Sequence, residues 1–151
     1  MQRERPLVIG VGNPQCGDDA AGPLVIEQIG SRAGSRIDLE AITGACTGLV
    51  EHLCERDNVI IVDACKSGAP AGTLHCLDAG RTEPYQGSIS CHGFGVAEAI
   101  ALARVMGTMP KSCTIFAIEG KNFGMADVMS EPVRRAVTSL VSDLSRQLQL
   151  D

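Results

Sequence analysis

The chain has 151 residues, of which 44% are hydrophobic and 21% are charged, and its formal net charge is −5. These values predict one folded domain, residues 1–151, with a core that needs no disulfide or metal. They exclude disorder, collagen-like repeats and heptad rods. The short apolar runs predict no membrane span, and the acidic charge with four Phe and Tyr residues in total disfavours a nucleic-acid surface.

The cysteine pattern favours a reducing compartment. The seven cysteines are an odd number, none stands in a CxxC spacing, and no secretion signal precedes the first strand-like run. We therefore expect a cytoplasmic protein, a monomer, without a disulfide framework or a structural zinc site. Cys16, Cys65 and Cys91 stand near candidate functional residues, and we interpret them as packing residues, the alternative being that they line a site or react.

Five strands are expected. Three apolar runs without polar alternation are typical of strands buried on both faces of a parallel sheet: residues 7–9, 59–62 and 114–118. Two alternating segments, residues 37–42 and 73–78, are typical of edge strands. The connection through residues 66–72 is too short for a parallel crossover, so the strand at 73–78 is predicted to be antiparallel.

Four helices are expected between and after these strands. The first three helical patterns cover residue 20 to about 31, residues 47–55, and residue 93 to about 106. The fourth is a long amphipathic helix, with Ser130 as its N-cap and Pro132 in its first turn. The order predicts an α/β fold, a three-layer α/β/α sandwich around a five-stranded, mostly parallel sheet with one antiparallel strand.

Acidic residues follow each of the three buried strands. Asp18 and Asp19 follow the first strand through a glycine-containing loop, Asp63 is expected to end the third, and Glu119 ends the last. Ligands of open α/β sheets bind beyond the carboxyl ends of the strands, so these carboxylates are expected to converge on one edge. The alternative is structural, because an Asp after a strand often caps the next turn.

His92 is the histidine best placed to join these acids. It precedes an Ala-rich helix, whose positive N-terminal end disfavours an imidazolium, and neutral imidazole is the form that binds metals. Asp19, Asp63 and His92 would form a three-ligand set with open positions, suited to zinc, nickel or manganese. His75, inside an alternating strand, is interpreted as a surface or edge residue.

The first loop does not fit a dinucleotide-binding site. The spacing after Gly10 and Gly12 lacks the third glycine of the G-x-G-x-x-G fingerprint, and two aspartates at the exit of the loop would repel a phosphate. A nucleotide-binding α/β domain is therefore the least favoured of the functions considered.

An ordered series of motifs resembles the hydrogenase maturation proteases, the endopeptidases that finish the large subunit of nickel–iron hydrogenases. The similar motifs run through nearly the whole chain: Gly10-x-Gly12-Asn13 with Asp18-Asp19 and Gly22, Thr43-Gly44 with Gly48-Leu49, Val62-Asp63-Ala64, Ser90-x-His92, Ala117-Ile118-Glu119, and residues 129–137. The resemblance implies a five-stranded α/β/α sandwich and metal ligands at Asp19, Asp63 and His92.

The resemblance also implies an activity and a partner. The expected reaction is removal of a C-terminal extension from the nickel-loaded large-subunit precursor, and the ligands would engage nickel held by that precursor, or another divalent metal such as zinc. Asn13, Thr43 and Gly44 are the implied substrate-binding residues. Two departures, Ala45 in place of the second glycine of a Gly-Gly pair and Ala20-Ala21 before Gly22, bear on substrate fit.

Two routes of water activation are compatible with these residues. A metal held by the three ligands would activate water and polarise the carbonyl, with Asp18 as general acid or base, whereas the other route is water activation by a carboxylate alone. No G-x-S-x-G or H-E-x-x-H signature competes with these routes. The alternative from another class is a non-catalytic chaperone that binds nickel or the precursor on the same fold.

Overall fold

A computed structural model describes residues 4–80 and 95–150 of the chain. The five described strands are β1 (Leu7–Val11), β2 (Asp38–Ile42), β3 (Asn58–Cys65), β4 (Leu74–Asp78) and β5 (Ser112–Glu119). The helices are the short 3-10 helix η2 (Gly17–Ala20), α1 (Ala21–Ala33), α2 (Thr47–Glu55), α3 (Val96–Met106) and α4 (Glu131–Gln147).

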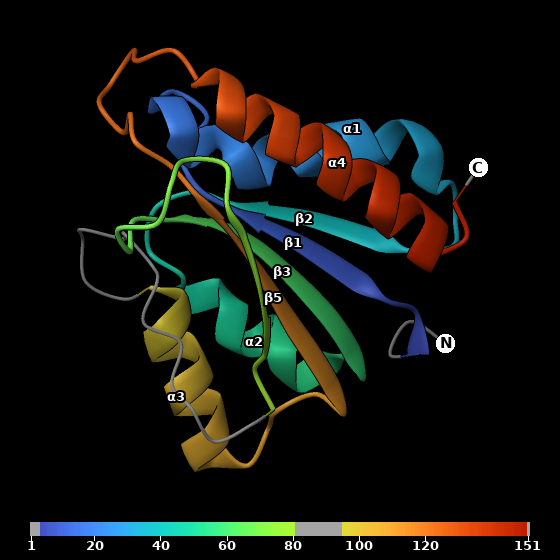
Figure 1. Cartoon of the computed structure of the whole chain (residues 1–151). Helices are drawn as coiled ribbons and strands as arrows, with labels where there is room; N and C mark the ends of the chain where they lie inside the picture. Colours follow the sequence, from blue (N-terminus) through green and yellow to red (C-terminus); the bar gives the residue numbers. More distant parts are fainter. Residues whose placement is uncertain (1–3, 81–94, 151) are drawn as a thin grey trace.

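The strands form one sheet in the order β2-β1-β3-β5-β4. The pairs of β1 with β2, β1 with β3 and β3 with β5 are parallel, and β4 runs antiparallel to β5. Helices α1 and α4 lie side by side on one face, whereas α2 and α3 cover the other (Figure 1). The predicted three-layer sandwich, with its one antiparallel strand, is confirmed.

Burial explains the strand patterns. All five residues of β1 are buried, and in β3 every residue after Asn58 is buried, because each strand has helices on both faces. Apolar side chains that alternate along the strands divide into two core clusters, one against α2 and α3 and the other against α1 and α4. The edge strands β2 and β4 are half-buried or exposed, as their alternating sequences predict.

Several boundaries differ from the expectations by one to three residues. Strand β3 continues past Asp63 to Cys65, because it pairs with β5 along its whole length. The first helix begins at Ala21, after the unpredicted turn η2, and ends at Ala33. The predicted start of the third helix at Gly93 lies outside the described residues.

In the part of the chain that the structure describes, no helix has the length and apolarity that crossing a bilayer requires.

The N-terminal end of α1 lies against the sheet without side chains between them. A Cβ on Gly10 would stand 2.3 Å from the Gly22 carbonyl oxygen, and a Cβ on Gly22 would stand 2.5 Å from that of Val11 and 2.7 Å from that of Val62. Glycine is required at both positions because the backbones of α1, β1 and β3 touch. This contact places η2, and with it Asp18 and Asp19, directly beyond the carboxyl end of β1.

Two alanine substitutions test this close approach. Gly10→Ala is expected to lower the free energy of unfolding by about 3 kcal/mol, because backbone atoms must move to admit the methyl group. Gly30→Ala, inside α1, meets only the Leu39 side chain at 3.7 Å and is expected to raise it by about 0.5–1 kcal/mol through helix propensity. Urea denaturation measures both. Equal effects of the two substitutions would contradict the assigned contact.

Candidate active site

Asp19 is held at the carboxyl end of β1 by the loop that precedes it. The Asn13 N–H donates to Oδ2 of Asp19 at 2.8 Å, and the Gly12 N–H donates to the Ile42 carbonyl, which joins this loop to the end of β2. Gly12 has a φ of 145°, and a Cβ there would lie 1.9 Å from the Asp19 carbonyl oxygen, so only glycine fits. Burial raises the pKa of Asp19, and the hydrogen bond from Asn13 opposes this effect only in part.

Asp63 lies within β3, directly after the buried apolar residues 59–62 and beside Ala117 of β5. Its side chain is 3% exposed, and Oδ1 accepts a hydrogen bond from the Ala64 N–H at 2.9 Å. The alternation of β3 directs Asp63 to the same face as Ile61 and Cys65, which belong to the core beneath α2 and α3.

The two predicted acids act on one thiol. The pKa of Cys46, at the start of α2, is raised to about 11, first by burial and then by the negative charges of Asp63, Glu98 and Asp19. The Cys46 thiol is therefore influenced by the charges of both carboxylates. His92, the third predicted ligand, and Cys91 lie outside the described residues.

The predicted substrate-binding loop borders this region. Thr43 and Gly44 directly follow β2 and are exposed. Asn13 is half-buried on the β1 loop, which the hydrogen bond from the Gly12 N–H to the Ile42 carbonyl joins to the end of β2. Gly44 adopts the left-handed conformation, with a φ of 84°. Ala45 has a negative φ, so its replacement of a second glycine places no strain on the backbone.

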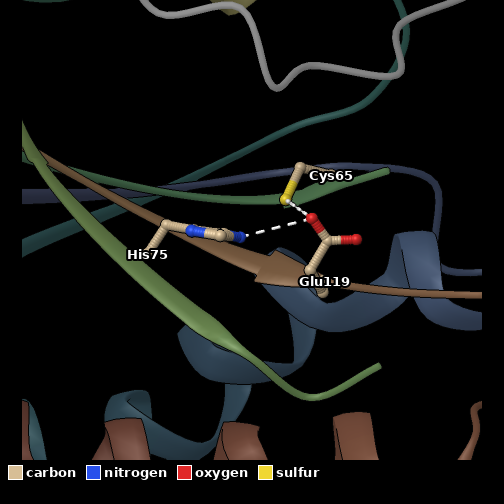
Figure 2. Close-up of side chains that lie close together, drawn as sticks. All are labelled: Cys65, His75 and Glu119. Atoms are coloured by element: carbon tan, nitrogen blue, oxygen red, sulfur yellow. Dashed lines mark hydrogen bonds and ion pairs between the residues drawn. The ribbon is translucent and has the colours of Figure 1, made fainter. Parts of the chain in front are cut away.

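Glu119, the acid at the end of β5, is 1% exposed and is hydrogen-bonded to three residues. It accepts hydrogen bonds from the Ser67 N–H and hydroxyl, from the Cys65 thiol at 3.4 Å, and from Nε2 of His75 at 3.2 Å (Figure 2). Burial acts to raise its pKa, but the bonds from Ser67, Cys65 and His75 outweigh it, and the pKa is lowered.

His75 and Cys65 therefore do more than the sequence predicted. His75 is an edge residue, as expected, but it points inward to Glu119, and the buried Cys65 is a hydrogen-bond donor besides packing in the core. The antiparallel register sets His75 beside Ala117, on the face that also carries Glu119. The alternating sequence of residues 73–78 indicates that His75 belongs to an edge strand. Its position next to Glu119 depends on the strand register, which is a property of the tertiary structure.

Asp18 is fully buried and connects η2 to the segment between β5 and α4. Its oxygens accept the Lys121 N–H at 2.8 Å, the Asn122 N–H at 3.0 Å, and both the N–H and hydroxyl of Ser130. Burial would raise the pKa of Asp18, but these bonds together lower it. Ser130 precedes α4 as predicted, although its hydroxyl binds Asp18 and not the first turn of the helix. These contacts give Asp18 a structural role, because they tie η2 to the segment before α4.

Comparisons with known proteins show the family of this chain. A family model of hydrogenase maturation proteases matches residues 41–147. The hydrogenase 2 maturation protease of Escherichia coli strain K12 is 30% identical over 118 residues, which cover 76% of this chain and 72% of that protein. The chain belongs to the hydrogenase maturation protease family. It is therefore classed as a hydrolase, an endopeptidase of hydrogenase maturation, and the chaperone alternative is not favoured.

Further relatives of this maturation protease are similar in sequence, and solved structures share its fold. The hydrogenase expression/formation protein HoxM of Azotobacter vinelandii is 27% identical, over 85% of this chain and 64% of that protein. The solved structure of the hydrogenase maturating endopeptidase HybD from E. coli superposes with a TM-score of 0.78 at 22% identity, covering 96% of this chain and 92% of that one. The maturation protease HycI from Thermococcus kodakarensis gives a TM-score of 0.77 at 20% identity, over 96% and 92%.

The structural role of Asp18 is testable in metal-free protein. Asp18→Asn is expected to lower the free energy of unfolding at pH 7 by about 3 kcal/mol, because an amide cannot accept all of these donors. The folded-state pKa of Asp18 is lowered, so its contribution is present above about pH 4, the ordinary carboxyl pKa, and is lost as the pH falls further. The difference between wild type and variant, measured by urea denaturation, should therefore shrink below pH 4.

Asp127→Asn is the matched control, since this exposed carboxylate accepts only the Gly124 N–H among the bonds found at its side chain. Its effect should stay below about 1 kcal/mol at every pH. A difference for Asp18→Asn that is equally small at pH 7 would show that the carboxylate does not hold the loop.

Proposed function

We propose that this maturation protease removes a C-terminal extension from the nickel-loaded precursor of a hydrogenase large subunit, and that Asp19, Asp63 and His92 engage the nickel. The observation that carries the proposal is that Asp19, held by the Asn13 N–H after β1, and Asp63, near the end of β3, stand at the carboxyl ends of two adjacent parallel strands. Open α/β sheets bind their ligands at this edge, which supports a shared role for the two carboxylates.

The donor set fits a divalent metal. Carboxylate oxygens and an imidazole nitrogen suit nickel and zinc, with positions left for a substrate group. Among the described residues, the hydrogen bond at the Asp19 side chain reaches Oδ2, which leaves Oδ1 to act as a ligand. When bound, the metal polarises the scissile carbonyl and lowers the pKa of water.

The chain itself positions these groups. Asp18 ties η2 to the segment before α4, so the neighbouring Asp19 is presented from a fixed turn. Because Asp18 has a lowered pKa and its oxygens are occupied, we assign it to positioning. Asp19, whose Oδ2 accepts the Asn13 N–H and whose Oδ1 is proposed as a ligand, is assigned to metal binding.

The extension of the precursor is proposed to lie along the loops at the same edge. The exposed backbone of Thr43 and Gly44 follows β2, and the Asn13 side chain belongs to the β1 loop that is hydrogen-bonded to the end of β2. A peptide that lies here would present its scissile bond to Asp19.

The test is cleavage of a purified, nickel-loaded large-subunit precursor, followed by mass spectrometry. Asp19→Asn, Asp63→Asn and His92→Ala are each expected to slow removal of the extension by at least about 100-fold, since each removes a ligand. Precursor without nickel should not be cut.

Asp143→Asn serves as the control, because Asp143 is exposed on α4 and pairs only with Arg146 in the bonds found there. It should cleave at the wild-type rate. Wild-type rates in the three site variants would overturn the assigned site, and tight binding of the precursor without any cleavage by wild type would favour the chaperone.

A further inference from the structure

Three metal-binding side chains converge from three strands outside the proposed nickel site. Cys65 ends β3, Glu119 ends β5 and is its partner in register, and His75 lies on β4 beside Ala117. The side chains point toward one another above the sheet, with Oε1 of Glu119 between the thiol and the imidazole (Figure 2). The pairing of the strands therefore fixes all three Cα positions.

The distances correspond to those of a tetrahedral metal site. One donor atom from each residue lies within 4.8 Å of the other two, with Oε1 of Glu119 at 3.4 Å from Sγ and 3.2 Å from Nε2. Bond lengths to zinc of about 2.0–2.3 Å place two ligands of a tetrahedron roughly 3.3–3.6 Å apart. A metal would therefore fit between these atoms with small side-chain movements.

The surroundings support the ligands and leave a path for the ion. Cys65 and Glu119 are 1% exposed, whereas the His75 side chain is 34% exposed and opens the cluster to solvent. The Ser67 N–H and hydroxyl donate to Glu119 independently of the other two residues. Such outer-shell donors hold a carboxylate ligand in orientation.

We propose that Cys65, His75 and Glu119 form a second metal site of this protein, for a zinc-type divalent ion. One thiolate, one imidazole and one carboxylate are the donors that zinc takes in proteins, and the fourth position remains for water. Binding releases the thiol proton to solvent, and the imidazole binds as the neutral ring through Nε2. The ion would join the carboxyl ends of β3 and β5 to β4.

This site is separate from the proposed nickel site. Asp63 precedes Cys65 by two residues on the same strand face, but among the described residues the group of mutually close donors contains Cys65, His75 and Glu119 only. The two sites also differ in their donor atoms, because the Asp19, Asp63 and His92 set contains no thiolate. The proposal does not depend on the proposed function.

Cobalt substitution tests the proposal in the untagged, reduced, metal-free full-length protein. One equivalent of Co²⁺ is expected to produce a thiolate-to-cobalt charge-transfer band in the near ultraviolet, which Zn²⁺ then removes. Cys65→Ser should abolish the band, and His75→Gln should weaken Co²⁺ binding at least about 10–100-fold. Circular dichroism reports folding, and His75, being partly exposed, gives a variant that does not disturb the core.

The controls separate the two sites. Cys76→Ser, on the exposed side of β4, and Cys113→Ser, buried in β5, should retain the band, as should Asp63→Asn. A wild-type protein without the band would show a hydrogen-bond network only, and a band that survives Cys65→Ser would place the thiolate elsewhere. Loss of the band in Asp63→Asn would assign the thiolate to the nickel site. Each of these three results would overturn the proposal, whereas none involves the precursor.

Discussion

The contact between the N-terminal end of α1 and the strands beneath it determines the rest of the site. Gly10 and Gly22 lack side chains where their backbones touch, and a Cβ at either would stand within about 2.5 Å of a carbonyl oxygen. Because the helix lies this close, η2 must turn directly at the carboxyl end of β1. The two aspartates of η2 are consequently presented at the edge of the sheet, and a wider spacing would move both away from β3.

The neighbouring residues Asp18 and Asp19 show how environment assigns different roles to the same side chain. Asp18 is enclosed by donors from residues 121–130, which lower its pKa and fix the loop before α4. Asp19 is half-buried with one hydrogen bond, from Asn13, and its pKa is raised by the partial burial. The difference follows from the number of N–H and O–H groups that face each carboxylate. It is consistent with the roles proposed above, positioning by Asp18 and metal binding by Asp19.

The face of the sheet beneath α2 and α3 concentrates buried charge toward one edge. Asp63 and Glu119 are almost completely buried there, and Cys46 and Cys65 have raised pKa values that hold them as thiols in the free protein. Buried carboxylates are costly unless they are hydrogen-bonded, and Glu119 satisfies this through Ser67, Cys65 and His75. A metal would replace the protons of the last two donors with a single positive ion.

The sequence by itself determined the strands, the helices, the antiparallel place of β4 and the α/β/α class, because hydrophobic periodicity and connection lengths are local properties. It also predicted Asp19 and Asp63 as site residues, since acids near the carboxyl ends of buried parallel strands approach one edge of the sheet. The role of Asp18, the extension of β3 to Cys65 and the approach of His75 to Glu119 were decided only by the tertiary structure. These features depend on strand register and on donors about 45 to 110 residues away along the chain, and no local pattern encodes such pairings.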